Sequence, residues 1–239
     1  MRYLRSVSWV FEQKDWPVTL LCLAVASVVP MVGQVVANGY QAAVTVELGR
    51  GGSREQMQPF DLNALTDYLL KGLRLFLVGL VAGVLLLPLV FIGIAGLGLV
   101  AAFAGASAAG SGADPGPLLA GVMVTGGLLI AAVAVGISSL VAPLWLRAAH
   151  LEDLAAAYDF EFCKDFWRRA GWAALACQFG MAGIAIALSV VGMLCCFVGI
   201  FPAIALIFLA HAHLNAQLYR LYLERGGTSI VAASPAALS

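Results

Sequence analysis

Fifty consecutive residues carry no charge: AGWAALACQF GMAGIAIALS VVGMLCCFVG IFPAIALIFL AHAHLNAQLY, residues 170–219. A single helix of that length would measure about 75 Å, whereas the hydrocarbon core of a bilayer is about 30 Å thick. The stretch therefore predicts two membrane-spanning helices joined by a turn. We place the turn within residues 192–202, which hold two glycines and a proline.

Three further stretches also lack charged side chains: 16–46, 75–113 and 115–146. Charged residues make up only 11% of the chain, against about 25% in an ordinary soluble domain. This composition excludes a soluble enzyme and a disordered chain. We predict an all-α fold, a polytopic integral membrane helical bundle with four full spans, an N-terminal broken-helix hairpin and interfacial amphipathic helices.

The polar segments divide the chain further. An interfacial segment at 1–16, rich in aromatic and basic residues, precedes a single membrane domain at 17–225. Within this domain we expect, in order, a hairpin at 17–48, a cytoplasmic loop and surface helix at 49–71, a span at 72–103, an external loop at 104–117, a span at 118–146, a cytoplasmic amphipathic loop at 147–169 and a two-span hairpin at 170–222. The two surface helices are placed at 61–71 and 150–167. A disordered tail is expected at 226–239.

The orientation follows from the basic residues, which favour the cytoplasmic side. Lysine and arginine occur before residue 17, in 49–74, in 147–169 and after residue 219, but not in 104–117 or 192–201. We therefore expect the protein to lie in the inner membrane of the cell, with both termini in the cytoplasm. Because cytoplasmic segments flank 17–48 on both sides, that stretch must cross an even number of times or re-enter, with its tip at Pro30–Gly33. Glu12 and Asp15 argue against a cleaved signal peptide, so we expect the N-terminal segment to stay in the fold.

A polar stripe marks the second half of the N-terminal hairpin. Gln34, Asn38, Gln41 and Thr45 are spaced by 4, 3 and 4 residues, which places them on one helical face. Such a face is costly in lipid, so it is expected to contact another helix or an aqueous cleft. Hydrogen bonding between helices and a candidate polar groove are the two interpretations.

A second candidate site lies in the loop at 147–169, which carries nine charges and His150. Its candidate cytoplasmic interaction surface consists of Asp159, Glu161, Lys164, Arg168 and Arg169. Among the other notable residues, His211 and His213 are two apart and cannot bind one metal from one helical face, whereas His213 and Gln217 share a face. Gly79 and Gly83 form a G-x-x-x-G that we expect to pack within the chain.

Several short motifs occur in a fixed order. They are Phe11-Glu12 and Asp15-Trp16, Pro30-Met31-Val32-Gly33 with Gly39-Tyr40, Pro59-Phe60-Asp61 with Gly72, Ala155 to Phe160, Val198 to Pro202, and Asn215 to Tyr219. In these motifs the chain resembles domain-of-unknown-function family 4013, a group of bacterial and archaeal membrane proteins. The resemblance extends over residues 8–222 and implies a multi-pass fold. It implies no catalytic residue. The basic stretch before Pro59 and the long 104–117 segment depart from the family pattern.

We therefore expect a non-enzymatic membrane scaffold or accessory protein that acts through the lipid bilayer and a membrane or cytoplasmic protein partner. The alternative is a small-molecule or lipid transporter that uses the groove of residues 34–45. No H-E-x-x-H, G-x-S-x-G or P-loop motif is present, and we expect no catalytic residue, cofactor or metal. Zero net charge and the lack of a basic tract argue against a nucleic-acid partner.

Overall fold

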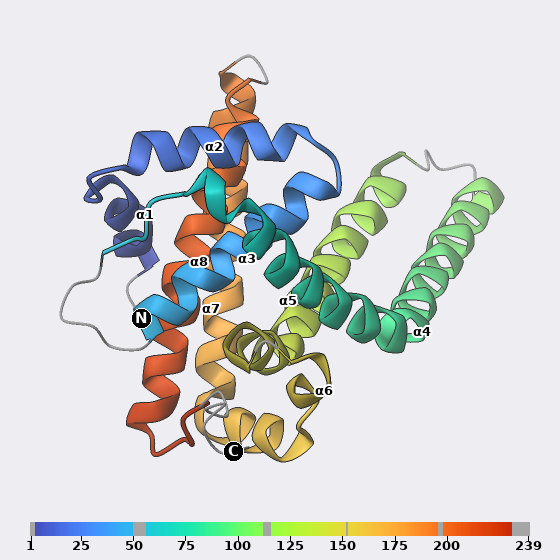
Figure 1. Ribbon diagram of the computed structural model, residues 1–239. Coiled ribbons are helices and arrows are strands. Elements are labelled where there is room, and N and C mark those ends of the chain that lie inside the picture. Colours follow the sequence, from blue (N-terminus) through green and yellow to red (C-terminus); the bar gives the residue numbers. More distant parts are fainter. Residues whose placement is uncertain (1–2, 50–55, 112–115, 152, 196–197, 231–239) are drawn as a thin grey trace. The chain divides into compact units, whose positions relative to one another are not determined.

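The computed structural model describes residues 3–49, 56–111, 116–151, 153–195 and 198–230, and no described residue lies in a strand. The helices, shown in Figure 1, are α1 (Tyr3–Phe11), α2 (Trp16–Val28), α3 (Val32–Gly49), the 3-10 turn η1 (Leu62–Ala64), α4 (Leu65–Ser111), α5 (Gly116–Leu151), α6 (Leu154–Ala157), α7 (Phe160–Leu194) and α8 (Ile200–Glu224).

Four of the described helical stretches are long and apolar enough to cross a membrane: Val90–Ser107, Ala120–Leu151, Leu154–Leu194 and Ile200–Glu224. This confirms the predicted all-α membrane fold and its four spans. The turn of the last hairpin lies between the end of α7 at Leu194 and the start of α8 at Ile200. Residues 196–197 of that turn lie outside the described residues.

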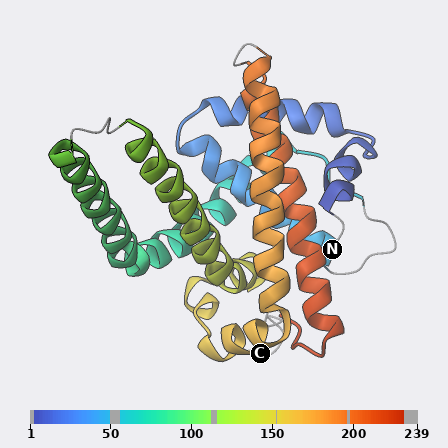
Figure 2. The same ribbon diagram turned by 180° about the vertical axis from the view of Figure 1, so that it is seen from behind.

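The chain forms two compact units, and the first comprises residues 1–79 and 141–239. Helix α8 is central to it and packs against α1, α2, α3 and α7 (Figures 1 and 2). Small side chains allow helices to approach closely, and five alanines of α8 are buried: Ala203, Ala205, Ala210, Ala212 and Ala216. Larger α8 residues fill the spaces between helices, for example Leu209 beside Trp9 of α1 and Tyr40 of α3.

The N-terminal hairpin breaks at residues 29–31, between α2 and α3. Met31 adopts a left-handed conformation with φ of 59°, which is unusual for a residue with a side chain. A Cβ atom at Gly33 would lie 1.6 Å from the Ala26 carbonyl oxygen. The two helices therefore approach each other so closely that position 33 has room for no residue other than glycine. At 1.5 Å per residue, α2 is about 20 Å long and α3 about 27 Å.

Helix α4 corrects the expected boundaries in 49–117. It begins at Leu65, after Asp61 accepts a hydrogen bond from the Asn63 amide at 2.9 Å, and continues without a break to Ser111. The surface helix predicted at 61–71 is therefore not separate from the following span, because the single Gly72 costs only about 1 kcal/mol in a helix. The first part of the predicted loop at 104–117 is also helical, since alanine favours helix. Residues 112–115 lie outside the described residues.

The segment predicted as one amphipathic helix at 150–167 is divided. Helix α5 ends at Leu151, the short α6 follows, and α7 begins at Phe160. The carboxylate of Asp153 accepts a hydrogen bond from the Ala155 amide, and that of Asp159 accepts from the amides of Glu161 and Phe162. Each aspartate therefore begins a new helix, and helical spacing of leucines alone did not reveal these starts.

The second unit, which we call the arm, comprises residues 80–140 and holds parts of α4 and α5. In its Val90–Ser107 stretch no described residue is buried. A Cβ atom added at Gly79 or Gly83 would meet no atom within 4 Å. The expectation that this G-x-x-x-G packs within the chain is therefore wrong for the described residues.

Candidate interaction site at the charged ends of α7 and α8

The ends of three helices meet at one end of the first unit. Gly49 ends α3, and a Cβ atom there would lie 3.1 Å from the Tyr219 ring of α8 and 3.6 Å from His150 Nε2 of α5. The Arg220 guanidinium donates to the Leu48 carbonyl, with Nε at 3.0 Å. The C-terminal ends of α3, α5 and α8 therefore lie at the same end of the first unit, as expected if all three lie on one side of a membrane.

Asp165 joins the first turns of α7 to the last turns of α8. Its carboxylate accepts hydrogen bonds from Arg168 Nη2 and from Arg169 Nε, each at 2.8 Å. Its Oδ2 also accepts from the Tyr222 hydroxyl at 3.0 Å. Charged partners strengthen these bonds, so Asp165 fixes the orientation of three side chains on two helices.

The chain after α8 folds back onto this cluster. The Tyr222 hydroxyl accepts from the Thr228 amide at 3.1 Å, and the Tyr219 hydroxyl accepts from the Ile230 amide at 2.8 Å. Arg169 Nη1 donates to the Arg225 carbonyl at 2.5 Å. Residues 226–230 are therefore held in place, which corrects the predicted start of a disordered tail at 226. Residues 231–239 lie outside the described residues.

A second ionic contact fixes the corner before α7. Arg147 Nη2 of α5 lies 3.2 Å from Asp159 Oδ2, and Arg147 Nε donates to the Ala156 carbonyl at 2.9 Å. The same guanidinium stands 5.0 Å from the centroid of the Phe162 ring. Because Asp159 also caps α7, the start of that helix is held from two sides.

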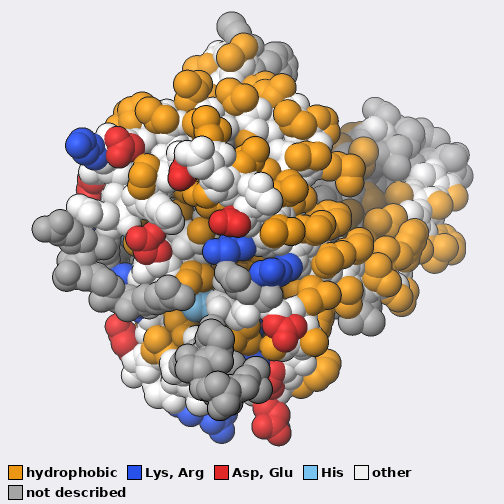
Figure 3. Space-filling view, viewed as in Figure 1, with side chains coloured by type: hydrophobic (Ala, Val, Ile, Leu, Met, Phe, Trp, Pro, Cys, Tyr) orange, Lys and Arg blue, Asp and Glu red, His pale blue; other side chains and the backbone are white. Residues whose placement is uncertain are grey.

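The five residues of the predicted interaction surface fall into two groups. Asp159 and Arg169 are half-buried and occupied in the contacts just described. Glu161, Lys164 and Arg168 are exposed and follow one another by 3 and 4 residues along α7, which places them on one face. Figure 3 shows charged side chains along the lower part of the view, where α7 begins, as well as at the upper left and in the centre, whereas the top, where the α7–α8 hairpin ends, is apolar.

Two aromatic residues that were not predicted from sequence flank this exposed face. Phe160, the first residue of α7, is 82% exposed, and Trp172 is 85% exposed. Trp172 follows Arg168 by four residues, so it continues the same face toward the apolar half of α7. The i, i+4 spacing of an arginine and a tryptophan at the edge of a charge-free stretch was the signal available, because tryptophan concentrates at membrane interfaces.

The polar stripe of α3 is not arranged as one open groove. Thr45 is fully buried and its hydroxyl donates to the Gln41 carbonyl at 2.8 Å, with the Ala212 carbonyl of α8 at 3.3 Å. Gln41 is buried, Asn38 is half-buried and Gln34 is exposed. The buried half of the stripe therefore contacts another helix.

A further polar cluster secures α1 to α8. His213 Nδ1 lies 3.0 Å from the buried Ser6 hydroxyl, and Gln217 Nε2 donates to the same hydroxyl at 3.3 Å. The Trp9 ring stacks on His213 with centroids 4.7 Å apart. His213 and Gln217 share a face as predicted, whereas Ser6 was not selected from the sequence. Among the described residues, no group of three histidine, cysteine or acidic side chains is placed to hold a metal ion.

Comparison with known proteins gives one finding. A family model with the description "Protein of unknown function (DUF4013)" matches residues 22–197, about three quarters of the chain. None of the curated proteins and none of the solved structures matches the chain.

Proposed function

We propose that this chain, which belongs to the DUF4013 family, is a non-enzymatic membrane scaffold or accessory protein. The family and the apolar helices establish a membrane protein of a family without an assigned function. The proposal adds a bacterial inner-membrane location, both termini in the cytoplasm, and a membrane or cytoplasmic protein partner that binds the exposed face of α7.

The observation that carries the proposal is the composition of this face. Glu161, Lys164 and Arg168 lie on one side of α7, between the exposed rings of Phe160 and Trp172. Aromatic residues and arginine are enriched among the residues that dominate protein interfaces. An exposed phenylalanine beside charges of both signs suits a protein partner, because the ring gives apolar contact and the charges give specificity.

The face is also rigid before any partner binds. Asp159 caps the N-terminus of α7, and the Asp165 carboxylate accepts hydrogen bonds from Arg168 and Arg169. Binding to such a surface loses less conformational entropy than binding to a flexible loop. The predicted surface is thereby refined, because Asp159 and Arg169 support the helix and leave Glu161, Lys164 and Arg168 for a partner.

The proposed orientation rests on where the basic residues lie. The charged ends of α7 and α8 are joined through Asp165 and Tyr222, and Arg220 of α8 contacts the end of α3. Lysine and arginine favour the cytoplasmic side, so this end is assigned to the cytoplasm.

The alternative functions have less support. A transporter with a groove lined by residues 34–45 would need these side chains to face an open path, whereas Gln41 and Thr45 are buried and Thr45 contacts α8. An enzyme that uses Asp159 or Glu161 would need a free carboxylate, and the Asp159 carboxylate is paired with Arg147.

The proposal is tested by comparing single substitutions on and off this face. Lys164→Glu, Arg168→Glu and Phe160→Ala are made in the full chain, with Lys14→Glu as the matched control because Lys14 is also an exposed lysine. Each variant is expressed in its native membrane, cross-linked, and purified in mild detergent, and co-purifying proteins are quantified by mass spectrometry.

We expect one protein to be enriched with the wild type and with Lys14→Glu, and to be depleted by all three substitutions on α7. Equal recovery of every co-purifying protein from all four variants would overturn the proposal. An α7 variant that loses helical content or its monodisperse profile is excluded from the comparison, and the proposal is then judged on the remaining two α7 variants.

A further inference from the structure

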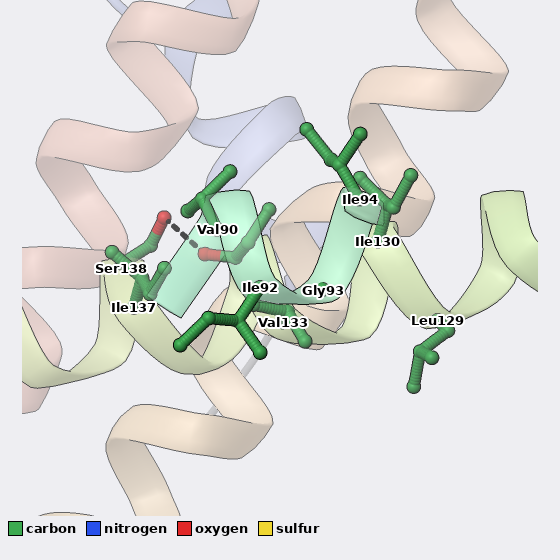
Figure 4. A pocket seen from close by; sticks show the side chains of 10 residues that line it. Val90, Ile92, Gly93, Ile94, Leu129, Ile130, Val133, Ile137 and Ser138 are labelled. Carbon is green, nitrogen blue, oxygen red and sulfur yellow. Dashed lines mark hydrogen bonds between the residues drawn. The ribbon is translucent and has the colours of Figure 1, made fainter. Parts of the chain in front are cut away.

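The arm contains a cleft between α4 and α5. Its volume is about 500 Å³, within the range of about 300–1,000 Å³ that is typical of small-molecule sites. One wall comes from α4, with Val90, Gly93 and Ile94, and the other comes from α5, with Ile130 and Val133 among others (Figure 4). All of these residues belong to the arm, so the cleft is formed within one compact unit.

The wall of the cleft is almost entirely apolar. Ser138 is the one residue of the lining with a polar side chain, and its hydroxyl donates to the Ala134 carbonyl of the same helix at 2.8 Å. Figure 4 shows this hydrogen bond along α5, between consecutive turns of the helix. The Ser138 hydroxyl has already donated its proton, so a ligand in the cleft would make mainly dispersion contacts with the lining.

Both walls lie in stretches long and apolar enough to cross a membrane, so we assign the cleft to hydrocarbon depth. Val90–Ile94 lie at the start of the candidate span Val90–Ser107, and Leu129–Ser138 lie within the candidate span Ala120–Leu151. Both walls belong to charge-free stretches, 75–113 and 115–146. A water molecule needs about 2–4 polar partners, which this lining does not provide, and a polar solute would lose its hydration there.

From the volume, the lining and the depth we infer that the cleft binds one acyl chain of a bilayer lipid. An empty cleft would forfeit the dispersion contacts of its walls, and a flexible hydrocarbon chain is the molecule at this depth that matches their apolar chemistry. The inference does not depend on the α7 surface or on the proposed function, since no residue of that surface lies in the arm.

Gly93 allows the cleft to be filled without disturbing the backbone. A Cβ atom added at this glycine would meet no other atom within 4 Å, so the side chain of Gly93→Leu has room to enter the space. Gly105→Leu is the matched control, because Gly105 lies on the same helix, has the same open surroundings and is not part of the lining. Ala134→Leu narrows the cleft from α5 and serves as a second, independent variant.

The experiment uses the full chain in nanodiscs of phosphatidylcholine that contain a minor fraction of phosphatidylcholine with a diazirine in its acyl chain. After illumination, labelled peptides are mapped by mass spectrometry. The amount of label on Val90–Ile94 and Leu129–Ser138 is divided by the label on Met123, which is 77% exposed and lies outside the cleft.

We expect this ratio to be high in the wild type, to be unchanged in Gly105→Leu, and to fall by more than half in both Gly93→Leu and Ala134→Leu. A ratio that stays the same in both cleft variants would overturn the inference, because the label would then report general exposure to lipid. Absence of lipid label on the cleft residues of the wild type, with Met123 still labelled, would also overturn it, because the cleft would then be closed to lipid.

Discussion

The backbones of Gly39 in α3 and Gly72 in α4 lie so close together that neither position has room for a Cβ atom. A Cβ at Gly39 would be 1.8 Å from the Tyr68 carbonyl oxygen and 2.9 Å from the Gly72 nitrogen. A Cβ at Gly72 would be 1.8 Å from the Val35 carbonyl oxygen and 3.0 Å from the Gly39 nitrogen. The crossing sets the start of α4 directly on α3, beside the ring contacts of Tyr40 and Tyr68.

Gly39→Ala and Gly72→Ala should therefore each destabilise the fold strongly. The atoms that block the new methyl group belong to the backbone, which cannot move aside as a side chain can, so we expect a loss of at least about 3 kcal/mol, the upper end of the usual cost of overpacking. Reversible unfolding in mixed micelles measures this loss. Gly79→Ala and Gly83→Ala are the controls, because their added methyl groups meet nothing within 4 Å.

The controls should be neutral or gain up to about 1 kcal/mol, since alanine is a better helix former than glycine. If all four alanine variants behaved alike, the close crossing of α3 and α4 would be wrong.

Thr45→Val should weaken the packing of α3 on α8. The substitution keeps the shape of the side chain and removes the hydroxyl that contacts the Gln41 and Ala212 carbonyls. Hydrogen bonds of this kind in membrane proteins contribute about 0.6 kcal/mol on average and up to about 1.7 kcal/mol, and we expect a loss in that range. Gln34→Leu, at the exposed end of the same stripe, should leave stability unchanged in the same unfolding assay. Equal stability of Thr45→Val and the wild type would contradict the assigned contact.

The corner between α2 and α3 should be sensitive to the residue at position 31. Met31 has a φ of 59° and is 72% exposed, so a substitution there changes backbone strain more than burial. The left-handed region costs an ordinary residue about 1–2 kcal/mol, β-branched residues suffer most, and asparagine tolerates it. We expect Met31→Val to lower the free energy of unfolding by about 1 kcal/mol relative to Met31→Asn. The reverse order of the two variants would show that the corner has a different backbone conformation.

Tyr222→Phe should release the segment that folds back after α8. The Tyr222 hydroxyl accepts from the Thr228 amide and donates to Asp165, and phenylalanine offers neither contact. Hydrogen exchange in nanodiscs should show faster exchange of the Thr228 amide in this variant. Tyr158→Phe removes a hydroxyl that contacts the Val78 carbonyl elsewhere, and it should leave the Thr228 amide unchanged. No difference between the two variants at Thr228 would rule out the contact.

Part of the candidate interaction site could be predicted from sequence, and part could not. Helical spacing on a charged stretch was sufficient to select Glu161, Lys164 and Arg168 as a group. It did not separate them from Asp159 and Arg169. Besides the nearby Asp165 that pairs with Arg169, the contacts of these two include Arg147 and the Arg225 carbonyl, which lie 12 and 56 residues away. A contact over such a separation leaves no periodic signal in the chain.

The polar stripe of α3 illustrates the same limit. The spacing of Gln34, Asn38, Gln41 and Thr45 determines that they share a face, but it does not determine what that face meets. The carbonyl of Ala212, which lies 3.3 Å from the Thr45 hydroxyl, is 167 residues away. A backbone carbonyl is present at every position, so its availability could not be recognised in the sequence.

The fold class, the four apolar spans and the break near Pro30–Gly33 can all be derived from the amino-acid sequence. These follow from composition, from the absence of charge and from local backbone preference, which act within a few residues or along one helix. The central place of α8, the crossing of Gly39 and Gly72 without side chains between them, and the set of charges on α7 that remain exposed are visible only in the folded chain. Those features depend on pairs of residues distant in the chain, whose distances are set by the packing of whole helices.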